Sequence, residues 1–484
     1  MLESLKSIVR NTAIIYSVEL INKVLQFVFI IYAARSLGVK TFGDLSYILT
    51  LYTFLQMLSD YGLGYSLPRE IAQSPGGRDW TFRIALRLRA AVTAAALLVF
   101  VLYLYAVKDP NAIRLAVVLG GLGLLLSSYA QNYVLSLRGL SLMKIDGAIR
   151  VSATFITTVL SVAAIMAGTG VIGVAAALFL GNIFMVATAL WVNRKTRVIG
   201  RPEAAPSGKD YLLAVKKGVP LMLMIIVASF YNRVDTLLLQ HLKGAVEVGL
   251  YHAAMRVTEG LLIFQAAFAM VLLPTLSRHI GEKDTEAVEK ITRLSIKYMA
   301  MIGIFLTVVT IMTADKIIEV LYFSPEYSGS VLGLQLFAFV NLMLYITTPL
   351  GYLLVSSRYE KIMVLLTFLM LVLNAGINLL VIPKYGFAGA AVVRFGTEVF
   401  GLIGSLIFIN KFIFRLDFFA EFKKPLIAGL ATAGFIYFAK SLLFIPLYLM
   451  LYGTLLYIMK AVTRWEVGFV KGIFIDKLKG QGRA

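Results

Sequence analysis

Two ionisable residues lie two positions apart inside one long apolar stretch of this 484-residue chain, where a charged side chain is costly. Arg233 and Asp235 are separated by about 200° around a helix, so they cannot comfortably pair with each other. At least one of them must face another helix or a cavity. A guanidinium group in such a place stays charged and binds phosphate through two parallel hydrogen bonds, so Arg233 is a candidate anion-binding residue.

Three further pairs of opposite charge are each spaced by about one helical turn: Glu19 with Lys23, Arg256 with Glu259, and Arg394 with Glu398. This spacing predicts ion pairs within one helix, which lower the cost of insertion and bind nothing. A binding role is the alternative, with Arg256, Arg394 and Lys23 as anion ligands. Their acidic neighbours and Asp235 would then hold the cations in an empty site or take up H⁺ or Na⁺ for coupling. Asp60, near a predicted helix end, is either a helix-end residue or a further coupling group.

The composition tells which elements position these residues. Hydrophobic residues make up 59% of the chain and charged residues only 15%, which leaves too few polar residues to cover a soluble exterior. Since one membrane-spanning helix needs roughly 20 apolar residues, the chain can supply about fourteen spans. The sequence therefore predicts an all-α polytopic membrane protein.

The basic residues predict how the spans are oriented. Of the 46 Lys and Arg residues, 34 fall at the termini and in the breaks after even-numbered spans, eight in the breaks after odd-numbered spans, and four inside spans. Loops rich in Lys and Arg stay in the cytoplasm. Both termini and all even-numbered breaks are therefore expected inside, with the protein in the cell membrane. The net charge of +20 fits loops held against an anionic leaflet better than it fits a nucleic acid partner.

Several classes of site are excluded by what the sequence lacks. There is no cysteine and there are only three histidines, so disulfide frameworks, iron–sulfur clusters and zinc-finger-like sites are not expected. No phosphate-binding G-x-x-x-x-G-K-[ST] loop occurs. The breaks are too short for a catalytic domain, so we expect no catalytic residues, no cofactor and no metal. Transport is the favoured activity.

The two halves of the chain share landmarks at constant offsets. Gly43 and Gly249 lie 206 residues apart, and so do Pro68 and Pro274, which follow the second and eighth spans. Gly170 and Gly386 lie 216 residues apart. Because each unit holds six spans, an even number, the copies are expected to have the same orientation. The matching prolines are candidate gating residues, although each could instead simply end its helix.

We therefore predict two six-helix lobes in parallel repeat around a central cavity, followed by two extra helices. The expected organisation is an N-terminal lobe at 1–196, a cytoplasmic linker at 197–217, a C-terminal lobe at 218–412, and two helices with a basic tail at 413–484. At the repeat offsets, Arg233 and Asp235 correspond to Phe27 and Phe29, so buried charge is expected to distinguish the second lobe.

The sequence from Ile382 to Ala391, Ile-Pro-x-Tyr-Gly-x-x-Gly-Ala-Ala, resembles the polysaccharide-biosynthesis flippases of the multidrug/oligosaccharidyl-lipid/polysaccharide exporter superfamily. Leu321–Tyr327, Ala33–Gly38 and Asp60–Gly64 extend the resemblance, which covers about residues 8–412. It implies a V-shaped alternating-access exporter that moves polyprenyl-linked oligosaccharides to the outer leaflet. Fourteen spans resemble the peptidoglycan-precursor branch, whereas many O-antigen-type flippases have twelve.

The leading hypothesis is therefore a flippase for a lipid-linked oligosaccharide or cell-envelope polysaccharide precursor, with membrane lipids and glycan-assembly enzymes as candidate partners. A multidrug exporter of amphipathic cations is the alternative and would favour a cavity dominated by carboxylates. The candidate charges are mixed, so they favour the flippase only slightly. A membrane scaffold without transport activity is the third possibility.

Overall fold

A computed structural model describes residues 2–73, 77–200, 206–439 and 441–462. Within these ranges the chain is helical and has no β-strand, which confirms the predicted all-α class. The predicted basic tail at 463–484 lies outside the described residues, as do residues 201–205 of the predicted linker. The boundaries predicted for the lobes and the linker stay predictions.

Ten helical stretches in the described part of the chain are long and apolar enough to cross a membrane. Two of them, Ile14–Gln73 and Glu360–Phe412, contain 60 and 53 residues, more than twice the length of one crossing. Counted as two crossings each, they raise the number to twelve, and α14 (Phe418–Ala439) and α15 (Ile445–Ile458) follow. The predicted fourteen spans agree approximately with this count, and the protein is a multi-pass membrane protein.

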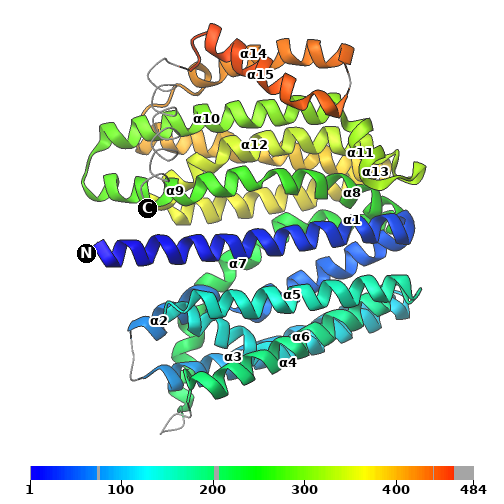
Figure 1. The fold of residues 1–484 in the computed structure, drawn as a ribbon, viewed down its shortest axis with the longest axis vertical. Coiled ribbons are helices and arrows are strands. Elements are labelled where there is room, and N and C mark those ends of the chain that lie inside the picture. The colour runs from blue at the N-terminus through cyan, green and yellow to red at the C-terminus, as the bar shows by residue number, and fades with distance from the viewer. Residues whose placement is uncertain (1, 74–76, 201–205, 440, 463–484) are drawn as a thin grey trace, which may run out of the picture. The chain divides into compact units, whose positions relative to one another are not determined.

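The first long helix, α1 (Leu2–Asp60), replaces the predicted loop between the spans at 10–35 and 43–65 by a sharp bend (Figure 1). Gly38 alone leaves helical geometry, with φ 71° and ψ 168°. A residue without Cβ adopts this positive φ without steric cost, so a single glycine is enough to redirect the chain.

The chain divides into two compact units. Unit 1 contains residues 1–252 and 375–387, and unit 2 contains residues 253–374 and 388–484. Besides α1, the helices of unit 1 are α2 (Leu63–Gln73), α3 (Arg78–Ala106), α4 (Asn111–Gly139), α5 (Met143–Met166), α6 (Gly170–Thr196) and α7 (Gly208–Leu242). Within it, α4 packs against α3 and α6, and α1 packs against α5 and α7. A capping box formed by Ser207 and Asp210 starts α7 inside the segment predicted as linker.

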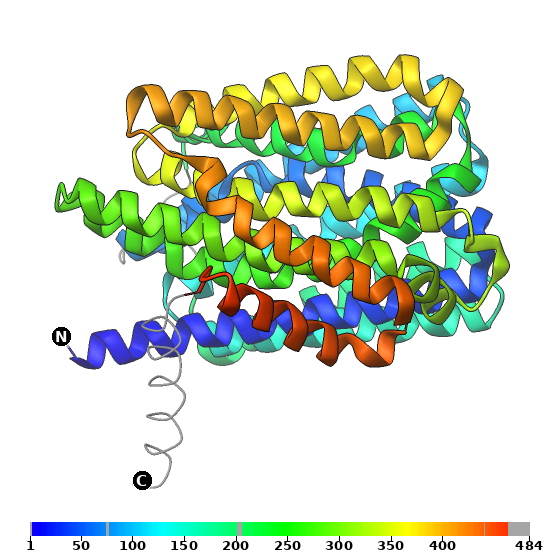
Figure 2. The same cartoon turned by 90° about the horizontal axis from the view of Figure 1, so that it is seen from above.

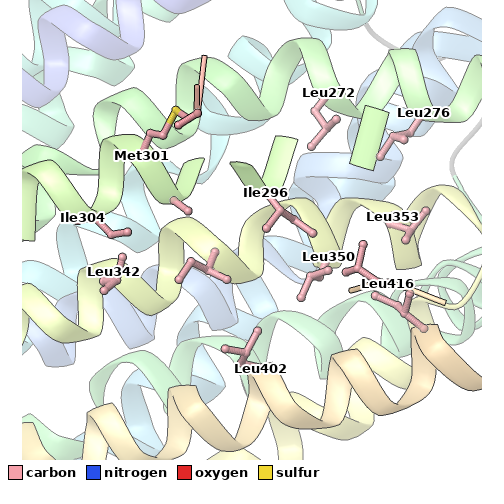
Figure 3. Packing of buried hydrophobic residues seen from close by; sticks show 14 of the residues in the cluster. Leu272, Leu276, Ile296, Met301, Ile304, Leu342, Leu350, Leu353, Leu402 and Leu416 are labelled. Atoms are coloured by element: carbon pink, nitrogen blue, oxygen red, sulfur yellow. The ribbon is translucent and has the colours of Figure 1, made fainter. Parts of the chain in front are cut away.

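The helices of unit 2 are α9 (Ile263–Gly281), α10 (Thr285–Met312), α11 (Ala314–Tyr322), α12 (Ser330–Ser356), α14 and α15, while α8 (Ala245–Leu261) and α13 (Glu360–Phe412) contribute residues to both units. Short 3₁₀ turns, η2 (Pro325–Tyr327) and η3 (Leu442–Phe444), precede α12 and α15. The helices α14 and α15 form an antiparallel pair, drawn in orange and red in Figure 2. Figure 3 shows the apolar core of this unit, where Ile296, Leu350 and Leu353 are fully buried.

The backbone repeats at both offsets found in the sequence. Gly38 and Gly244, 206 residues apart, have φ values of 71° and 87°, and Gly170 and Gly386, 216 residues apart, have φ values of 60° and 57°. Two pairs of glycines with positive φ at matching positions support the predicted duplication.

One contact in unit 1 is reciprocal with respect to this repeat. A Cβ placed on Gly43 would overlap the carbonyl oxygen of Ala245, and one on Gly249 would overlap the carbonyl oxygen of Val39. Val39 and Ala245 are themselves 206 residues apart. The backbones of α1 and α8 therefore touch through equivalent atoms, and neither glycine has room for a side chain.

Candidate functional site

The carboxylate of Asp235 lies deep inside unit 1. Its side chain is 1% exposed, and it accepts hydrogen bonds from the Tyr251 hydroxyl and from the Asn378 amide, both at 2.7 Å. Both donors are uncharged, and together they orient the carboxylate. Such a group can hold a proton or a small cation. One residue further along α7, Thr236 lies 2.9 Å from Nε2 of His252, and both side chains are buried.

Arg233 is half-buried and lies on the same helix, two positions before the buried Asp235. That angular separation agrees with the expectation that these two residues face different surroundings. The neighbouring Asn232 is exposed. The side of α7 that carries Asn232 and Arg233 is therefore more accessible than the side that carries Asp235.

Unit 2 contains the two charge pairs that the spacing predicted within single helices. Nη1 of Arg256 lies 2.8 Å from Oε2 of Glu259, and Nη2 of Arg394 lies 3.2 Å from Oε1 of Glu398. The first pair is partly accessible, and the second is almost completely buried. Both intrahelical ion pairs are confirmed.

The predicted ion pair of Glu19 with Lys23 is not the one that the structure shows, because the Glu19 carboxylate contacts an arginine of another helix. Nη1 of Arg150, on α5, lies 2.6 Å from Oε1 of Glu19, while Lys23 is exposed. Arg150 also contacts the buried Asp146 at 3.0 Å, and Asp146 contacts Arg138 at 2.9 Å. A guanidinium group held in place by a second carboxylate offers Glu19 a firmer partner than one flexible lysine on the same helix.

Asp60, for which the sequence predicts a helix-end or coupling role, is part of a partly buried network, in which its own side chain is 29% exposed. Its Oδ1 accepts a hydrogen bond from Nη2 of Arg89 at 2.9 Å, and its Oδ2 accepts one from the Gly64 amide at 3.1 Å. Arg89 is 2% exposed and also donates to Oε1 of Gln131 on α4. Asp60 therefore joins α1 to α3 and α4, besides capping α2.

Comparison with known protein families shows which family the chain belongs to. Residues 8–280 match the family model described as polysaccharide biosynthesis protein, which is more than half of the chain. The chain belongs to this family. Residues 220–380 of this polysaccharide-biosynthesis family member also match the MatE model, and both families lie in the MOP superfamily of transporters. No curated protein sequence matches it significantly.

Solved structures share the fold of this polysaccharide-biosynthesis family member at low identity. A structure titled lipid II flippase MurJ, in an inward closed conformation, is 13% identical with a TM-score of 0.74, and the match covers 93% of this chain and 98% of that one. An inward-facing multidrug resistance MATE family transporter is 15% identical, with a TM-score of 0.65 and coverage of 83% and 96%.

A third structure comes from Pyrococcus furiosus, and its title describes a MOP superfamily transporter with a binding pocket of reverse polarity. It is 16% identical to this polysaccharide-biosynthesis family member, with a TM-score of 0.56, and the match covers 89% of this chain and 96% of that one. At such identities the three structures support the fold, including its many membrane-spanning helices.

The two repeat-related prolines of this family member both lie inside helices. Pro68 is in α2, which continues to Gln73, and Pro274 is in α9, which continues to Gly281. The alternative that each proline simply ends its helix is therefore wrong. A proline inside a helix removes one backbone hydrogen bond, so each marks a point where the helix bends more easily.

Sequence reasoning misses Arg89 and Arg150 as buried or partly buried cations. Both fall within two to three turns of a predicted cytoplasmic break, where basic residues are expected in any case. A closer signal exists for Arg150, which is spaced i, i+4 from Asp146. In the described part of the chain, no three His, Cys, Asp or Glu side chains are grouped so that they could hold a metal ion.

Proposed function

We propose that this protein is a flippase that moves a polyprenyl-(pyro)phosphate-linked oligosaccharide or cell-envelope polysaccharide precursor from the inner to the outer leaflet by alternating access. The observation that supports it is the presence of Arg233 and Arg256 inside apolar helices, within the residues that match the polysaccharide biosynthesis family. Guanidinium groups in a low-dielectric setting bind phosphate oxygens in pairs and keep their charge. Membrane lipids and glycan-assembly enzymes are the proposed partners, and nucleic acid is not.

We assign the substrate phosphate to Arg233 first, because it is half-buried on the more accessible side of α7. Arg256 is 20% exposed in its ion pair with Glu259, so a phosphate could replace this carboxylate at little cost. Lys23 is exposed and offers a point charge from unit 1. Arg394 contributes less, because its pair with Glu398 is almost completely buried.

Coupling is assigned to Asp235. Its burial makes its charge costly, and binding of Na⁺ or H⁺ would offset that cost while Tyr251 and Asn378 hold the side chain in place. The Asp235→Asn variant keeps the shape but not the charge. We expect it to bind substrate and to lose the dependence of transport on an ion gradient.

Both termini are proposed to lie in the cytoplasm of a cell with a polyprenyl carrier, on the basis of the Lys and Arg distribution. In the same proposal, Pro68 and Pro274 shape how the helices that contain them bend during access changes. No cofactor is proposed.

The test is transport of a labelled lipid-linked sugar in proteoliposomes by Arg233→Lys and Arg233→Ala at matched protein levels. If phosphate binding is bidentate, lysine should be nearly as harmful as alanine, because it keeps the charge and loses the fork. Arg278, which is 72% exposed, provides the matched control as Arg278→Lys and Arg278→Ala. Wild-type transport by Arg233→Ala/Asp235→Ala would mean that the arginine is structural.

An antiporter of amphipathic cations is the second candidate, since residues 220–380 also match the MatE model. Uptake of a fluorescent organic cation into the same proteoliposomes distinguishes the two. Transport of the cation without transport of the lipid-linked sugar would replace the flippase proposal.

A further inference from the structure

Three polar side chains connect the end of α7 to α1 and to the loop between α3 and α4. The Tyr47 hydroxyl donates a hydrogen bond to Oδ2 of Asp109 at 3.0 Å, and its oxygen lies 3.1 Å from Nε2 of His241. Tyr47 is fully buried and Asp109 is 5% exposed, whereas His241 is exposed. A buried carboxylate is thus linked through one phenol to an exposed imidazole.

The protons of this cluster can be counted. Tyr47 gives its single proton to Asp109, so its oxygen can only accept a hydrogen bond from His241. A hydrogen bond from His241 to Tyr47 therefore requires the form of the imidazole that carries a proton on Nε2. The Tyr103 hydroxyl lies 2.7 Å from the same nitrogen and can accept this proton, or donate its own to a bare Nε2. A neutral imidazole has one proton, which can move to Nδ1 and leave Nε2 bare. A protonated imidazole always keeps the Nε2 donor and adds a positive charge.

Asp109 supplies the negative charge at the other end. Burial raises the pKa of the Asp109 carboxyl, while the hydrogen bond from Tyr47 and the positive charges of His241 and Arg114 oppose that rise. Nε of Arg114 also donates to the backbone oxygen of Asp109 at 2.7 Å, which fixes the loop. Ionised Asp109 therefore gains from a charged imidazole beyond Tyr47.

The other charged groups near the cluster come from α1 and from the turn after α7. Asp44 is hydrogen-bonded to Gln240 and interacts electrostatically with Lys40 and Asp109. Lys243 is exposed on the turn itself. Asp44 already has Gln240 and Lys40 as partners, and His241 is the side chain at the end of α7 that contacts Tyr47 directly.

The cluster lies next to the close backbone contact between α1 and α8, which we expect to be either closed or open. The turn after α7 leads directly into the reciprocal contact in which Gly43 meets Ala245 and Gly249 meets Val39. Backbone atoms packed this closely either touch or separate as a whole, since packed interfaces are bistable and not continuously deformable. The charge of the imidazole can therefore determine whether the turn after α7 is held against α1 or released from it.

We propose that His241, Tyr47 and Asp109 form a proton-binding site that fastens the turn between α7 and α8 to α1 while His241 is protonated. A protonated imidazole loses its positive charge as pH rises, and the tie then weakens. The negative charge is lost as pH falls through the raised pKa of Asp109, and the tie weakens again. Fastening is strongest between these limits. By the distribution of basic residues, this end of unit 1 faces the outside, so the external pH would set the state.

The chain has no cysteine, so one introduced cysteine reports without background. Val39, 8% exposed in the reciprocal contact, serves as Val39→Cys in purified protein in detergent, without substrate. The measurement is its rate of reaction with a maleimide at about pH 6 and about pH 8. Ser328→Cys, an exposed position in unit 2, gives the reference rate that corrects for thiol ionisation.

We expect the corrected rate to be at least about five-fold higher at the higher pH, the lower end of typical coupling between two sites. His241→Gln and, separately, Tyr47→Phe should each remove this pH dependence, and Asp109→Asn should remove the release expected at more acidic pH. A corrected rate independent of pH in the otherwise unmodified protein, or the same pH dependence in His241→Gln, would overturn the proposal. Because no substrate is used, failure of the flippase proposal leaves this result unaffected.

Discussion

The two units neutralise their buried charges in different ways. In unit 2, Arg256 pairs with Glu259 and Arg394 with Glu398, each within a single helix. In unit 1, Arg150 also pairs with Asp146 within α5, but other contacts cross between helices: Arg89 reaches from α3 to the end of α1, and Arg150 reaches from α5 to Glu19 on α1. These inter-helix contacts of unit 1 join separate helices, whereas the pairs of unit 2 need only one turn of helix.

This difference teaches what each kind of pair can specify. An ion pair within one helix can form as soon as that helix inserts into the membrane. It lowers the free energy cost of burying the two charges, but it does not depend on which other helices pack against it. A pair between helices forms only when the correct faces meet, and it leaves an unpaired charge in any other arrangement. The inter-helix pairs of unit 1 therefore select one packing, whereas the partly accessible pair of unit 2 leaves Arg256 available for exchange with a ligand.

The largest expected effect comes from breaking the inter-helix pair. Arg89→Ala leaves Asp60 and Gln131 without their shared donor and should destabilise the protein by about 3 kcal/mol. Thermal unfolding in detergent measures this loss. Arg256→Ala is the matched change in unit 2 and should cost less than half as much.

Arg89→Ala/Asp60→Ala should recover part of the stability lost in the single variant, because no unpaired carboxylate remains. Equal losses of stability in Arg89→Ala and Arg256→Ala would show that the inter-helix pair does not contribute more to stability than the pair within one helix.

A smaller effect is expected from the close backbone contact in unit 1. In Gly43→Ala, the new methyl group would meet the carbonyl oxygen of Ala245, so the helices must separate, at about 2 kcal/mol. Gly396 of α13 has open space where a methyl group would lie, so Gly396→Ala should be neutral or slightly stabilising. Unfolding of both variants under the same conditions checks this, and a loss in Gly396→Ala as large as that in Gly43→Ala would contradict it.

The smallest effect is expected at the partly accessible pair of unit 2. Glu259→Gln removes an ion pair whose carboxylate is 35% exposed, and the free energy of unfolding should change by less than about 1 kcal/mol. Its effect on substrate affinity should be the larger one, since the arginine no longer has a competing anion. A binding titration with inorganic pyrophosphate measures this. Weaker binding than in the unmodified protein would assign Glu259 to positioning Arg256.

Features that depend on a few neighbouring residues are predictable from the sequence. Apolar length predicts the helices, and one-turn spacing predicts the pairs Arg256 with Glu259 and Arg394 with Glu398. The repeat offsets lead to glycines whose backbone angles match. Each of these signals lies within one helix or follows from a simple count along the chain.

Features that depend on which faces meet are not predictable in this way. Arg89 lies close to a basic cytoplasmic break, and only its packing against α1 and α4 shows that it is buried. Glu19 has Lys23 one turn away and still contacts Arg150, 131 residues later in the chain. The cluster of Tyr47, Asp109 and His241 combines three segments that no spacing rule connects.

The reciprocal contact between Gly43 and Gly249 also has the symmetry of a dimer interface. In a two-fold symmetric dimer, residue i of one subunit meets residue j of the other, and j meets i. Gly43 meets Ala245 and Gly249 meets Val39, the arrangement that two identical half-length chains would make around such an axis. The contact therefore has the form of an isologous interface, made here within a single chain.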